Sequence, residues 1–227
     1  MTMFDLEPVA RQSTAELIAD RLRIAIMRGS LAPGAQLGEA DLAATFDVSR
    51  GPVREAMQRL VSEGLLHSVR HRGIFVIELT MDDIEDVYFA RAAIERGAMC
   101  RILDGRRGAT HAALGPAVEM MRSAADRGDA AAVSDADQQF HEVLVQSSGS
   151  PRLVRAARTL LIETRMCLGA LQTTYGDVHE QVTEHAALRD AIGEGPVEIA
   201  YRLLADHMED AVARLRAQQA SVSETPA

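Results

Sequence analysis

From Thr80 to about residue 217 the chain is rich in Ala, Leu and Arg and carries few strand signals. So long a stretch without strand patterning must fold as helices that pack on one another. Glycine and proline divide it into roughly six helices. The breaks are Gly105–Gly108, Gly115-Pro116, Gly128, Gly149–Pro151, Gly176 and Gly193–Pro196. The Gly115-Pro116 pair is also compatible with a helix start. We predict an all-helical bundle over residues 79–218 and a flexible tail over 219–227.

Residues 1–78 have a different pattern, in which three short amphipathic helices precede a hairpin. Ser13-Thr14-Ala15-Glu16 has the form of a capping box and begins the first helix, which ends near Gly29. Further helices are predicted at 38–46 and 50–63, with the hydroxyl of Ser49 capping the last one. Apolar segments flank Arg70-His71-Arg72-Gly73, which is typical of a hairpin tip. This order predicts a winged helix-turn-helix domain, and the whole chain is therefore expected to be mostly α with a small β-hairpin wing.

The net charge of −9 argues at first against a nucleic-acid partner. All 24 basic residues are arginine, and their distribution changes that interpretation. Residues 1–78 carry a balance of −1 and residues 79–227 a balance of −8. The basic residues of segment 50–72 are Arg50, Arg54, Arg59, Arg70 and Arg72, against Glu55 and Glu63. Phosphates respond to charge within about a Debye length, so this local excess is compatible with DNA binding.

The rest of the composition excludes several classes of protein. The only cysteines are Cys100 and Cys167, so a disulfide scaffold is excluded. No stretch approaches the ~20 apolar residues of a membrane helix, and residues 1–12 do not have the pattern of a signal peptide. We therefore expect a cytoplasmic protein without a membrane partner.

The third predicted helix carries the chemistry of DNA recognition at its N-terminal end, which would enter the major groove. Arg50 and Arg54 are four residues apart and share the face opposite the apolar stripe. Arginine can pair with a guanine edge or hold a phosphate. Gly51 would let the backbone approach DNA closely, and the arginines of the hairpin tip suit phosphate or minor-groove contacts. A helix-turn-helix that serves as a protein-interaction module is the alternative.

The run from Gly34 to Gly73, with Val48-Ser49-Arg50-Gly51-Pro52-Val53-Arg54-Glu55-Ala56 at its centre, resembles the DNA-binding domain of GntR-type bacterial transcription regulators. The resemblance implies DNA contacts at Ser49, Arg50, Gly51, Arg54, His71, Arg72 and Gly73. Two positions depart from the family pattern. Asp47 stands where the turn usually has glycine, which implies backbone strain, and Gly51 stands where threonine is common.

The helical half contains a second constellation of residues. Asp137 and His141 are four residues apart and project from one helix face, while His185 and His207 lie on two later predicted helices. An aspartate and three histidines from three helices could converge and bind a divalent metal, with Zn²⁺ and Ni²⁺ both suited to the donor set. Each histidine could instead be a structural core residue, and the Asp–His pair a surface pair.

This half resembles the FadR-type (FCD) ligand-binding domain of the GntR superfamily, through Asp-x-x-Phe-His, Glu-His-x-x-Leu and a histidine in the last helix. The resemblance implies the metal-binding branch, with Asp137, His141, His185 and His207 as ligands. It also implies a small organic acid as effector beside the metal, held by Arg91. Arg165 is a second candidate because its predicted helix is dominated by the apolar residues Leu160, Leu161, Ile162 and Leu168. A simple ion pair between Arg91 and Glu95 is the alternative interpretation.

The sequence thus predicts a transcriptional regulator rather than an enzyme. We expect a homodimer that binds a palindromic double-stranded DNA operator and is released as a repressor by a carboxylate metabolite. A regulator that senses the metal directly is one alternative. A metal-dependent hydrolase or oxygenase is another, although no nucleophile motif or obvious general base accompanies the cluster.

Overall fold

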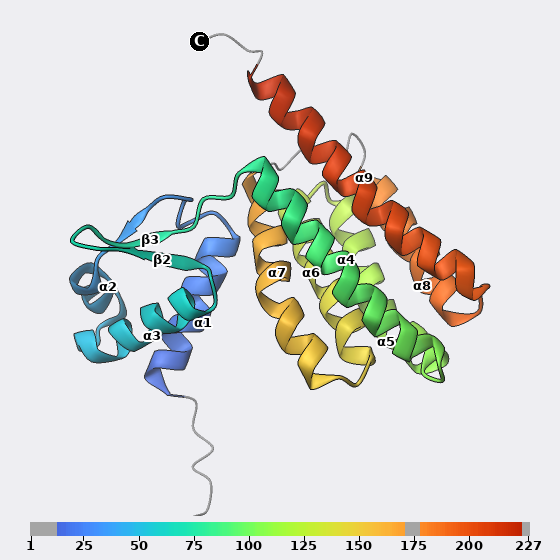
Figure 1. Ribbon diagram of the computed structural model, residues 1–227, viewed down its shortest axis with the longest axis horizontal. Helices are drawn as coiled ribbons and strands as arrows, with labels where there is room; N and C mark the ends of the chain where they lie inside the picture. The colour runs from blue at the N-terminus through green and yellow to red at the C-terminus, as the bar shows by residue number, and fades with distance from the viewer. Residues whose placement is uncertain (1–12, 171–177, 224–227) are drawn as a thin grey trace, which may run out of the picture. The chain divides into compact units, whose positions relative to one another are not determined.

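The computed structural model describes residues 13–170 and 178–223 (Figure 1). The chain forms two compact units. The N-terminal unit contains the residues up to Ile26 together with Leu31–Ile77, and the C-terminal unit contains Met27–Ser30 and the residues from Glu78 onward. The described residues form nine helices and one three-stranded sheet. The predicted class, mostly α with a small wing, is confirmed.

The N-terminal unit begins with α1 (Thr14–Met27). The predicted capping box is present, since the Glu16 amide donates to Ser13 Oγ at 3.1 Å and the Ser13 amide donates to Glu16 Oε2 at 2.9 Å. The apolar side chains of Ile18, Leu22 and Ile26 recur every four residues and are all buried. They supply one wall of the core of this unit.

Helices α2 (Glu39–Phe46) and α3 (Arg50–Ser62) are joined by a tight turn. Asp47 adopts the left-handed conformation there, with φ of 52°, so the strain expected at this position is present. Ser49 occupies the N-cap of α3, but its hydroxyl makes no capping bond, so this part of the prediction is wrong. Pro52 stands at the third helical position and has no N–H to donate, which leaves the Gly51 amide as the remaining donor in reach of a cap.

The sheet contains β1 (Gln36–Leu37), β2 (Leu66–Val69) and β3 (Gly73–Val76) in the antiparallel order β1-β3-β2. Strands β2 and β3 form the predicted hairpin. Strand β1 was not predicted, and it pairs Gln36 with Phe75. The Gln36 side chain also donates from Nε2 to the Arg72 carbonyl at 2.6 Å, so it ties the hairpin to the chain that precedes α2.

The C-terminal unit contains α4 (Met81–Leu103), α5 (Arg107–Asp126), α6 (Ala130–Ser147), α7 (Pro151–Ala170), α8 (Val178–Gly193) and α9 (Val197–Ser223). Thr80 and Asp83 form a reciprocal capping box at the start of α4. The largest buried cluster draws residues from all six helices, including Met99, Leu114, Phe140, Cys167, Ile192 and Leu204. The bundle therefore encloses a core to which every helix contributes.

Two boundaries of this unit differ from the sequence prediction. The break predicted at Gly115-Pro116 is absent, and Pro116 lies inside α5. Proline leaves the carbonyl four residues earlier without its helical donor, and that residue, Ala112, is exposed, so water can replace the lost bond. Helix α9 continues to Ser223, into the segment predicted as a tail. Residues 224–227 lie outside the described part of the chain.

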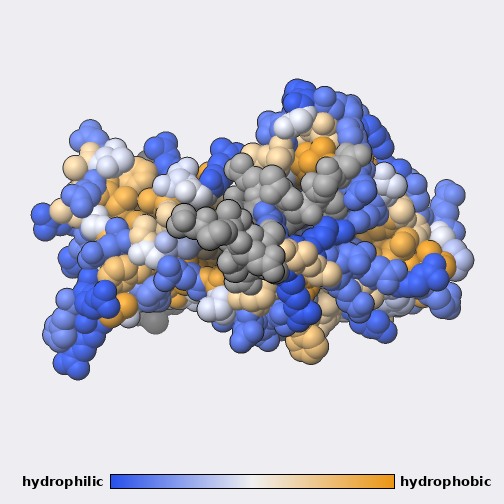
Figure 2. Space-filling model, turned by 90° about the horizontal axis from the view of Figure 1, so that it is seen from above, coloured by the Kyte–Doolittle hydropathy of each residue, from blue (hydrophilic) through white to orange (hydrophobic). Residues whose placement is uncertain are grey.

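The surface is mainly polar. On the face drawn in Figure 2, hydrophilic residues cover most of the molecule and hydrophobic residues are exposed only in scattered patches. Within the described ranges, no helix combines the length and the apolar character needed to cross a membrane.

Candidate functional site

Helix α3 presents one buried face and one exposed face. Val53, Met57 and Leu60 are buried, whereas Arg50 and Arg54 are exposed on the same helix. Arg54 is 64% exposed and makes a bidentate ion pair with Glu39, the first residue of α2. The predicted arginine pair is therefore presented to solvent, and one of its members already has a fixed partner.

The other predicted DNA contacts lie at two exposed places. Ser49 and Gly51 flank Arg50 at the start of α3. A Cβ added at Gly51 would have no atom within 4 Å, so the fold itself does not require glycine there.

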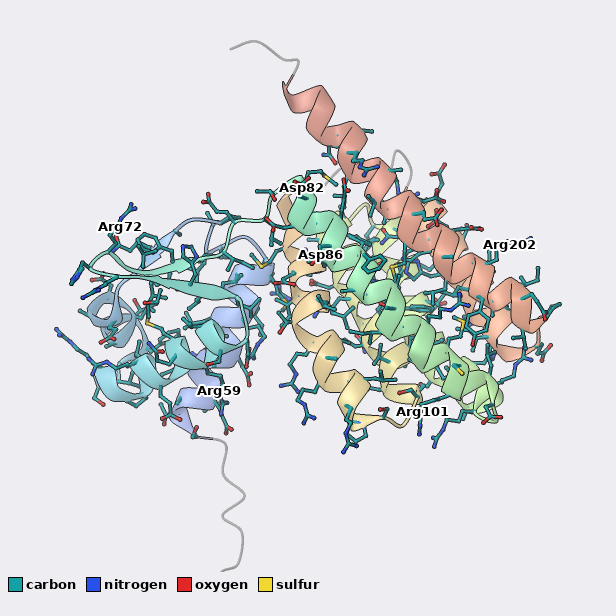
Figure 3. All side chains as sticks on the ribbon, in the orientation of Figure 1. Arg59, Arg72, Asp82, Asp86, Arg101 and Arg202 are labelled. Carbon is teal, nitrogen blue, oxygen red and sulfur yellow. The ribbon has the colours of Figure 1, made fainter. Side chains whose placement is uncertain are left out.

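Arg72 lies at the hairpin tip (Figure 3), and its guanidinium carbon lies over the Phe75 ring, 5.8 Å from the ring centroid. His71 and Gly73 have φ of 63° and 114°. A Cβ at Gly73 would approach Gln36 Nε2 to 2.8 Å, so glycine there has a structural role that is independent of DNA.

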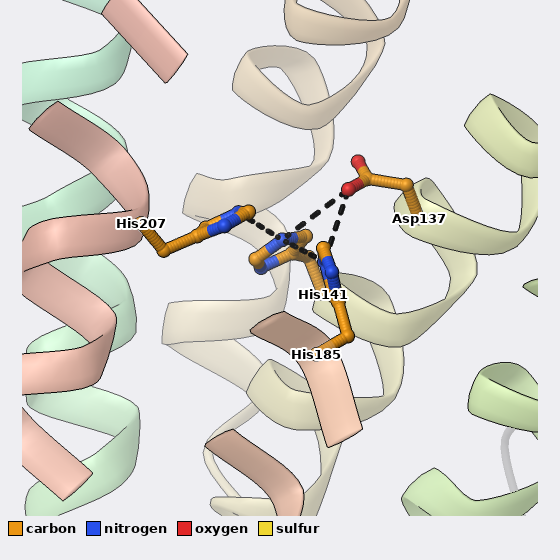
Figure 4. Close-up of side chains that lie close together, drawn as sticks. All are labelled: Asp137, His141, His185 and His207. Carbon is orange, nitrogen blue, oxygen red and sulfur yellow. Dashed lines mark hydrogen bonds and ion pairs between the residues drawn. The ribbon is translucent and has the colours of Figure 1, made fainter. Parts of the chain in front are cut away.

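The structure brings the four predicted metal ligands together inside the C-terminal unit (Figure 4). Asp137 and His141 come from α6, His185 from α8 and His207 from α9. The ligand atoms all lie within 4.8 Å of one another. His141 Nε2 is 3.2 Å from His207 Nε2 and 3.4 Å from His185 Nε2, and His185 Nε2 is 3.0 Å from Asp137 Oδ1. The four side chains are 8% exposed or less.

Each histidine has an oxygen acceptor on the opposite side of its ring. His141 Nδ1 is 2.7 Å from Glu95 Oε2, and His185 Nδ1 is 2.7 Å from the Gln181 carbonyl. His207 Nδ1 is 3.4 Å from Glu184 Oε2. Because carbonyl and carboxylate oxygens only accept, a neutral ring with its proton on Nδ1 satisfies each of these oxygens and turns the lone pair of Nε2 toward the centre. This tautomer is the one that a ligand histidine needs.

The electrostatics favour the neutral forms of His141 and His207 and the ionised form of Asp137. Burial lowers the pKa of His207 to about 4, and burial also lowers the pKa of His141. Burial acts to raise the pKa of Asp137, but the neighbouring imidazoles, His185 foremost, hold that pKa well below its usual value. Gln181 Nε2 also donates to Asp137 Oδ1 at 2.9 Å. The cluster therefore places one carboxylate and three imidazole nitrogens around a common centre.

This donor set fits a divalent metal ion. In a tetrahedron with Zn–N distances of ~2.0–2.1 Å, neighbouring ligand atoms are about 3.3 Å apart, close to the separations of 3.0, 3.2 and 3.4 Å given above. His141 Nε2 is farther from Asp137 Oδ1, at 3.9 Å, and all the ligand atoms remain within 4.8 Å of one another. Facing lone pairs and a buried carboxylate repel one another unless positive charge lies between them. Asp137, His141, His185 and His207 are thus the residues that could hold the ion.

Arg91 is linked to this cluster through Glu95. The Arg91 side chain is 1% exposed, its Nε donates to Glu95 Oε1 at 2.7 Å, and its Nη1 donates to Thr164 Oγ1 at 3.1 Å. Burial raises the pKa of Glu95, but His141 and Arg91 outweigh it and bring that pKa to about 2. The ion pair considered from the sequence is therefore present. Arg91 Nη2, however, is buried and has no hydrogen-bond partner among the described residues.

Arg165, the second effector candidate, has a different environment. Its Nε and Nη2 donate to Asp135 Oδ1 at 3.0 and 2.8 Å, and its Nη2 also lies 3.3 Å from the Ala131 carbonyl. These contacts anchor α7 to the first turns of α6. No contact found in the described ranges brings Arg165 to the four-residue cluster.

Sequence reasoning missed Gln181 and Glu184 and treated Glu95 only as a partner of Arg91. For Gln181 and Glu95 the sequence contains a weak signal, a spacing of four residues from another residue of the site. Gln181 precedes His185 by four residues, which places its carbonyl where a helical histidine can donate to it. Glu95 follows Arg91 by four residues, but its distance of 46 residues from His141 hides their contact.

An exposed arginine pair on the third helix of a winged helix-turn-helix, joined to a helical unit, defines a DNA-binding transcriptional regulator. Residues 14–76 match the family described as bacterial regulatory proteins, gntR family, and residues 86–210 match the FCD domain. The chain therefore belongs to the GntR family, with the FadR-type arrangement of a DNA-binding and an FCD domain. The relatives that it matches are transcriptional regulators.

The similarity extends over nearly the whole chain. An uncharacterised regulator of the helix-turn-helix type from Streptomyces ambofaciens is 32% identical over 91% of this chain and 88% of its own length. A probable D-xylose utilization operon transcriptional repressor from Paenarthrobacter nicotinovorans is 28% identical over 88% of both chains. The crystal structure of a regulator described as GntR from Rhodococcus superposes with a TM-score of 0.77 and 31% identity, over 91% of this chain and 99% of that one.

Proposed function

We propose that this regulator is a repressor that binds a palindromic operator as a homodimer and is released by a small carboxylate bound beside a divalent metal ion. The observation that carries the proposal is the arrangement of the three histidines. Each donates Nδ1 to an oxygen, so three Nε2 lone pairs and Asp137 face a common centre. Repression is proposed because the relatives include repressors of the D-xylose utilization and gluconate operons.

The metal would supply a Lewis-acidic binding position for a carboxylate. Zn²⁺ and Ni²⁺ both suit three imidazoles and one carboxylate, and an octahedral ion keeps positions open for further oxygen ligands. Arg91 supports a second contact, because its buried Nη2 still has a hydrogen-bond donor to offer. Its neighbour Glu95 bonds His141, so an effector on Arg91 would be linked to the metal ligands through one residue. Arg165 is bonded to Asp135 and the Ala131 carbonyl instead, so these contacts do not link it to the metal ligands.

The dimer is proposed to form through the exposed face of α4. Six of its eight exposed residues recur at alternating steps of four and three, which is the spacing of a helix-pairing stripe. The stripe consists of Asp82, Asp86, Phe89, Ala93, Arg96 and Cys100. Asp82 and Asp86 project from the N-terminal end of α4 (Figure 3). Phe89 is 77% exposed, which is unusual for so large an apolar side chain.

The stripe is complementary to itself when a second copy lies antiparallel to it. With the two-fold axis level with Arg91, Phe89 faces Ala93 of the second copy and Asp86 faces Arg96 of the second copy. A large ring would then meet a small side chain, and opposite charges would meet on either side. A second copy of this chain is thus the occupant that the charge order favours.

Replacing Phe89 by Arg is expected to convert the dimer into a monomer, because it removes the central apolar contact and places like charges near Arg96. The fold should be unaffected, since the side chain is mostly exposed. Light scattering coupled to size-exclusion chromatography measures the mass. The matched control is Met120→Arg, which adds the same charge at an exposed position on α5. A dimer that persists in Phe89→Arg would contradict the assignment of this face.

The proposed function is tested by selecting binding sites from a random duplex library and then titrating the complex with organic acids. We expect a two-fold symmetric consensus whose affinity falls steeply with salt. Arg50→Ala should weaken binding to that consensus by roughly tenfold. Release of DNA by a carboxylate in the presence of Zn²⁺ or Ni²⁺, and not after chelation, supports the proposal. Release by the metal alone would make the ion itself the signal, and an asymmetric or absent consensus would refute the DNA-binding model.

A further inference from the structure

Glu39 holds the guanidinium of Arg54 in one orientation. Arg54 Nε donates to Glu39 Oε1 at 2.9 Å and Arg54 Nη2 donates to Glu39 Oε2 at 2.8 Å. Two nearly parallel bonds fix the plane of the guanidinium as well as its position. Glu39 is the first residue of α2, and Arg54 lies in the second turn of α3, so the pair spans the turn of the helix-turn-helix.

The bonds to Glu39 use only one edge of the guanidinium. The N–H groups left over are both on Nη1 and one on Nη2, and no hydrogen bond from them is found in the described part of the chain. Two of these, one on each Nη atom, are parallel and point away from Glu39. This free pair of donors matches the O6 and N7 acceptors that guanine presents in the major groove. The side chain is 64% exposed, so these donors can be reached from outside.

The pair has little value as a stabilising interaction. Both side chains are partly exposed, and such ion pairs contribute little to folding. The hydrogen bond to Arg54 lowers the pKa of Glu39, so the carboxylate stays ionised at neutral pH. A carboxylate on a DNA-facing surface also repels phosphate, which weakens binding to DNA of any sequence. The contribution of Glu39 is to restrict Arg54 to one conformation. An arginine without a partner samples many rotamers and can contact phosphates as readily as bases.

We propose that Glu39 is a specificity-determining positioning residue, which orients Arg54 so that its free N–H pair reads one guanine in each half-site. The inference rests on the proposed function in one respect, namely that α3 enters the major groove. It predicts an unusual combination of effects for the loss of Glu39. Discrimination for guanine should fall while affinity for random DNA stays equal or rises, because a negative charge is removed.

The test compares Glu39→Ala with Glu55→Ala in selections from a random duplex library. Glu55 is a matched control because it is an exposed carboxylate on α3 for which the described residues provide no hydrogen bond or ion pair. Binding of the consensus duplex is then compared with that of a duplex in which the guanine is replaced by adenine. We expect the wild type and Glu55→Ala to prefer guanine and Glu39→Ala to lose roughly tenfold of this preference.

A double-mutant cycle separates orientation from charge. In an Arg54→Lys background, which cannot form the bidentate fork, Glu39→Ala should not change the preference for guanine. The inference is overturned if Glu39→Ala keeps the wild-type preference, or if Glu55→Ala loses it equally. In either case the wild type still selects a consensus, so the proposed function survives. A wild type that selects no consensus overturns the proposed function and this inference together.

Discussion

Loading the protein with Zn²⁺ or Ni²⁺ is expected to stabilise the C-terminal unit strongly. At a free metal concentration 100 times the dissociation constant, the free energy of unfolding should rise by about 2.7 kcal/mol. For a unit of this size that corresponds to a rise in melting temperature of roughly 5–10 °C. The physical reason is that the ion would replace repulsion among three lone pairs and Asp137 by coordination. Thermal denaturation followed by circular dichroism, with and without chelator, measures the shift.

Variants of the ligands provide the control for this experiment. Asp137→Ala and His185→Ala should remove the metal-dependent shift, because each takes away a ligand at the centre of the cluster. His179→Ala is the matched variant, since His179 is an exposed histidine on the same helix as His185. It should keep the full shift. Stabilisation by metal that survives in His185→Ala would show that the ion binds elsewhere.

Replacing Glu95 by Ala is expected to lower the free energy of unfolding by about 3–5 kcal/mol. Glu95 is fully buried, and its carboxylate is hydrogen-bonded to Arg91 on one side and to His141 on the other. Its loss leaves the Arg91 guanidinium charged and without its counter-ion in a dry environment. Urea denaturation in the presence of chelator measures the loss without a contribution from metal.

Removing both members of the buried pair should cost less than removing one. The variant Arg91→Met with Glu95→Leu buries no unpaired charge and leaves only His141 Nδ1 without its acceptor, which costs about 1–3 kcal/mol. Glu119→Ala is the surface control, because Glu119 pairs with Arg122 and is 68% exposed. It should change stability by less than about 0.5 kcal/mol. A loss in Glu95→Ala as small as in Glu119→Ala would mean that Arg91 finds another partner.

The sequence was informative about the fold wherever a local rule decides the structure. Helix periodicity and the caps at Ser13 and Thr80 were recognisable because the residues that interact are three or four apart. The two residues of β1 are too few to show any alternation, and their partner strand lies far along the chain. The break predicted at Pro116 was wrong because the free-energy cost of a proline inside a helix depends on whether water reaches the unpaired carbonyl of Ala112. Only the tertiary structure decides that exposure.

In the candidate site, too, some features could be predicted from the sequence and others depend on the tertiary structure. The four ligand-type residues could be predicted because their chemistry is distinctive and the chain resembles a known domain. Convergence of α6, α8 and α9 on one point, and the carboxylates behind His141 and His207, depend on helix packing that no local pattern encodes. Arg165 shows the limit of such reasoning, because its neighbourhood of apolar residues on α7 gave no indication that it pairs with Asp135.

The strand pairing of the N-terminal unit has a consequence for the order in which the chain folds. Gln36 pairs with Phe75, and Leu37 with Ile74, so the sheet closes only after the last residues of the hairpin are available. Such distant pairings form late, because the loop between them must be ordered first. During synthesis, α2 and α3 would therefore leave the ribosome before β3, and the sheet could form only once Val76 has also emerged. A nascent chain interrupted before that point carries the recognition arginines but not the wing.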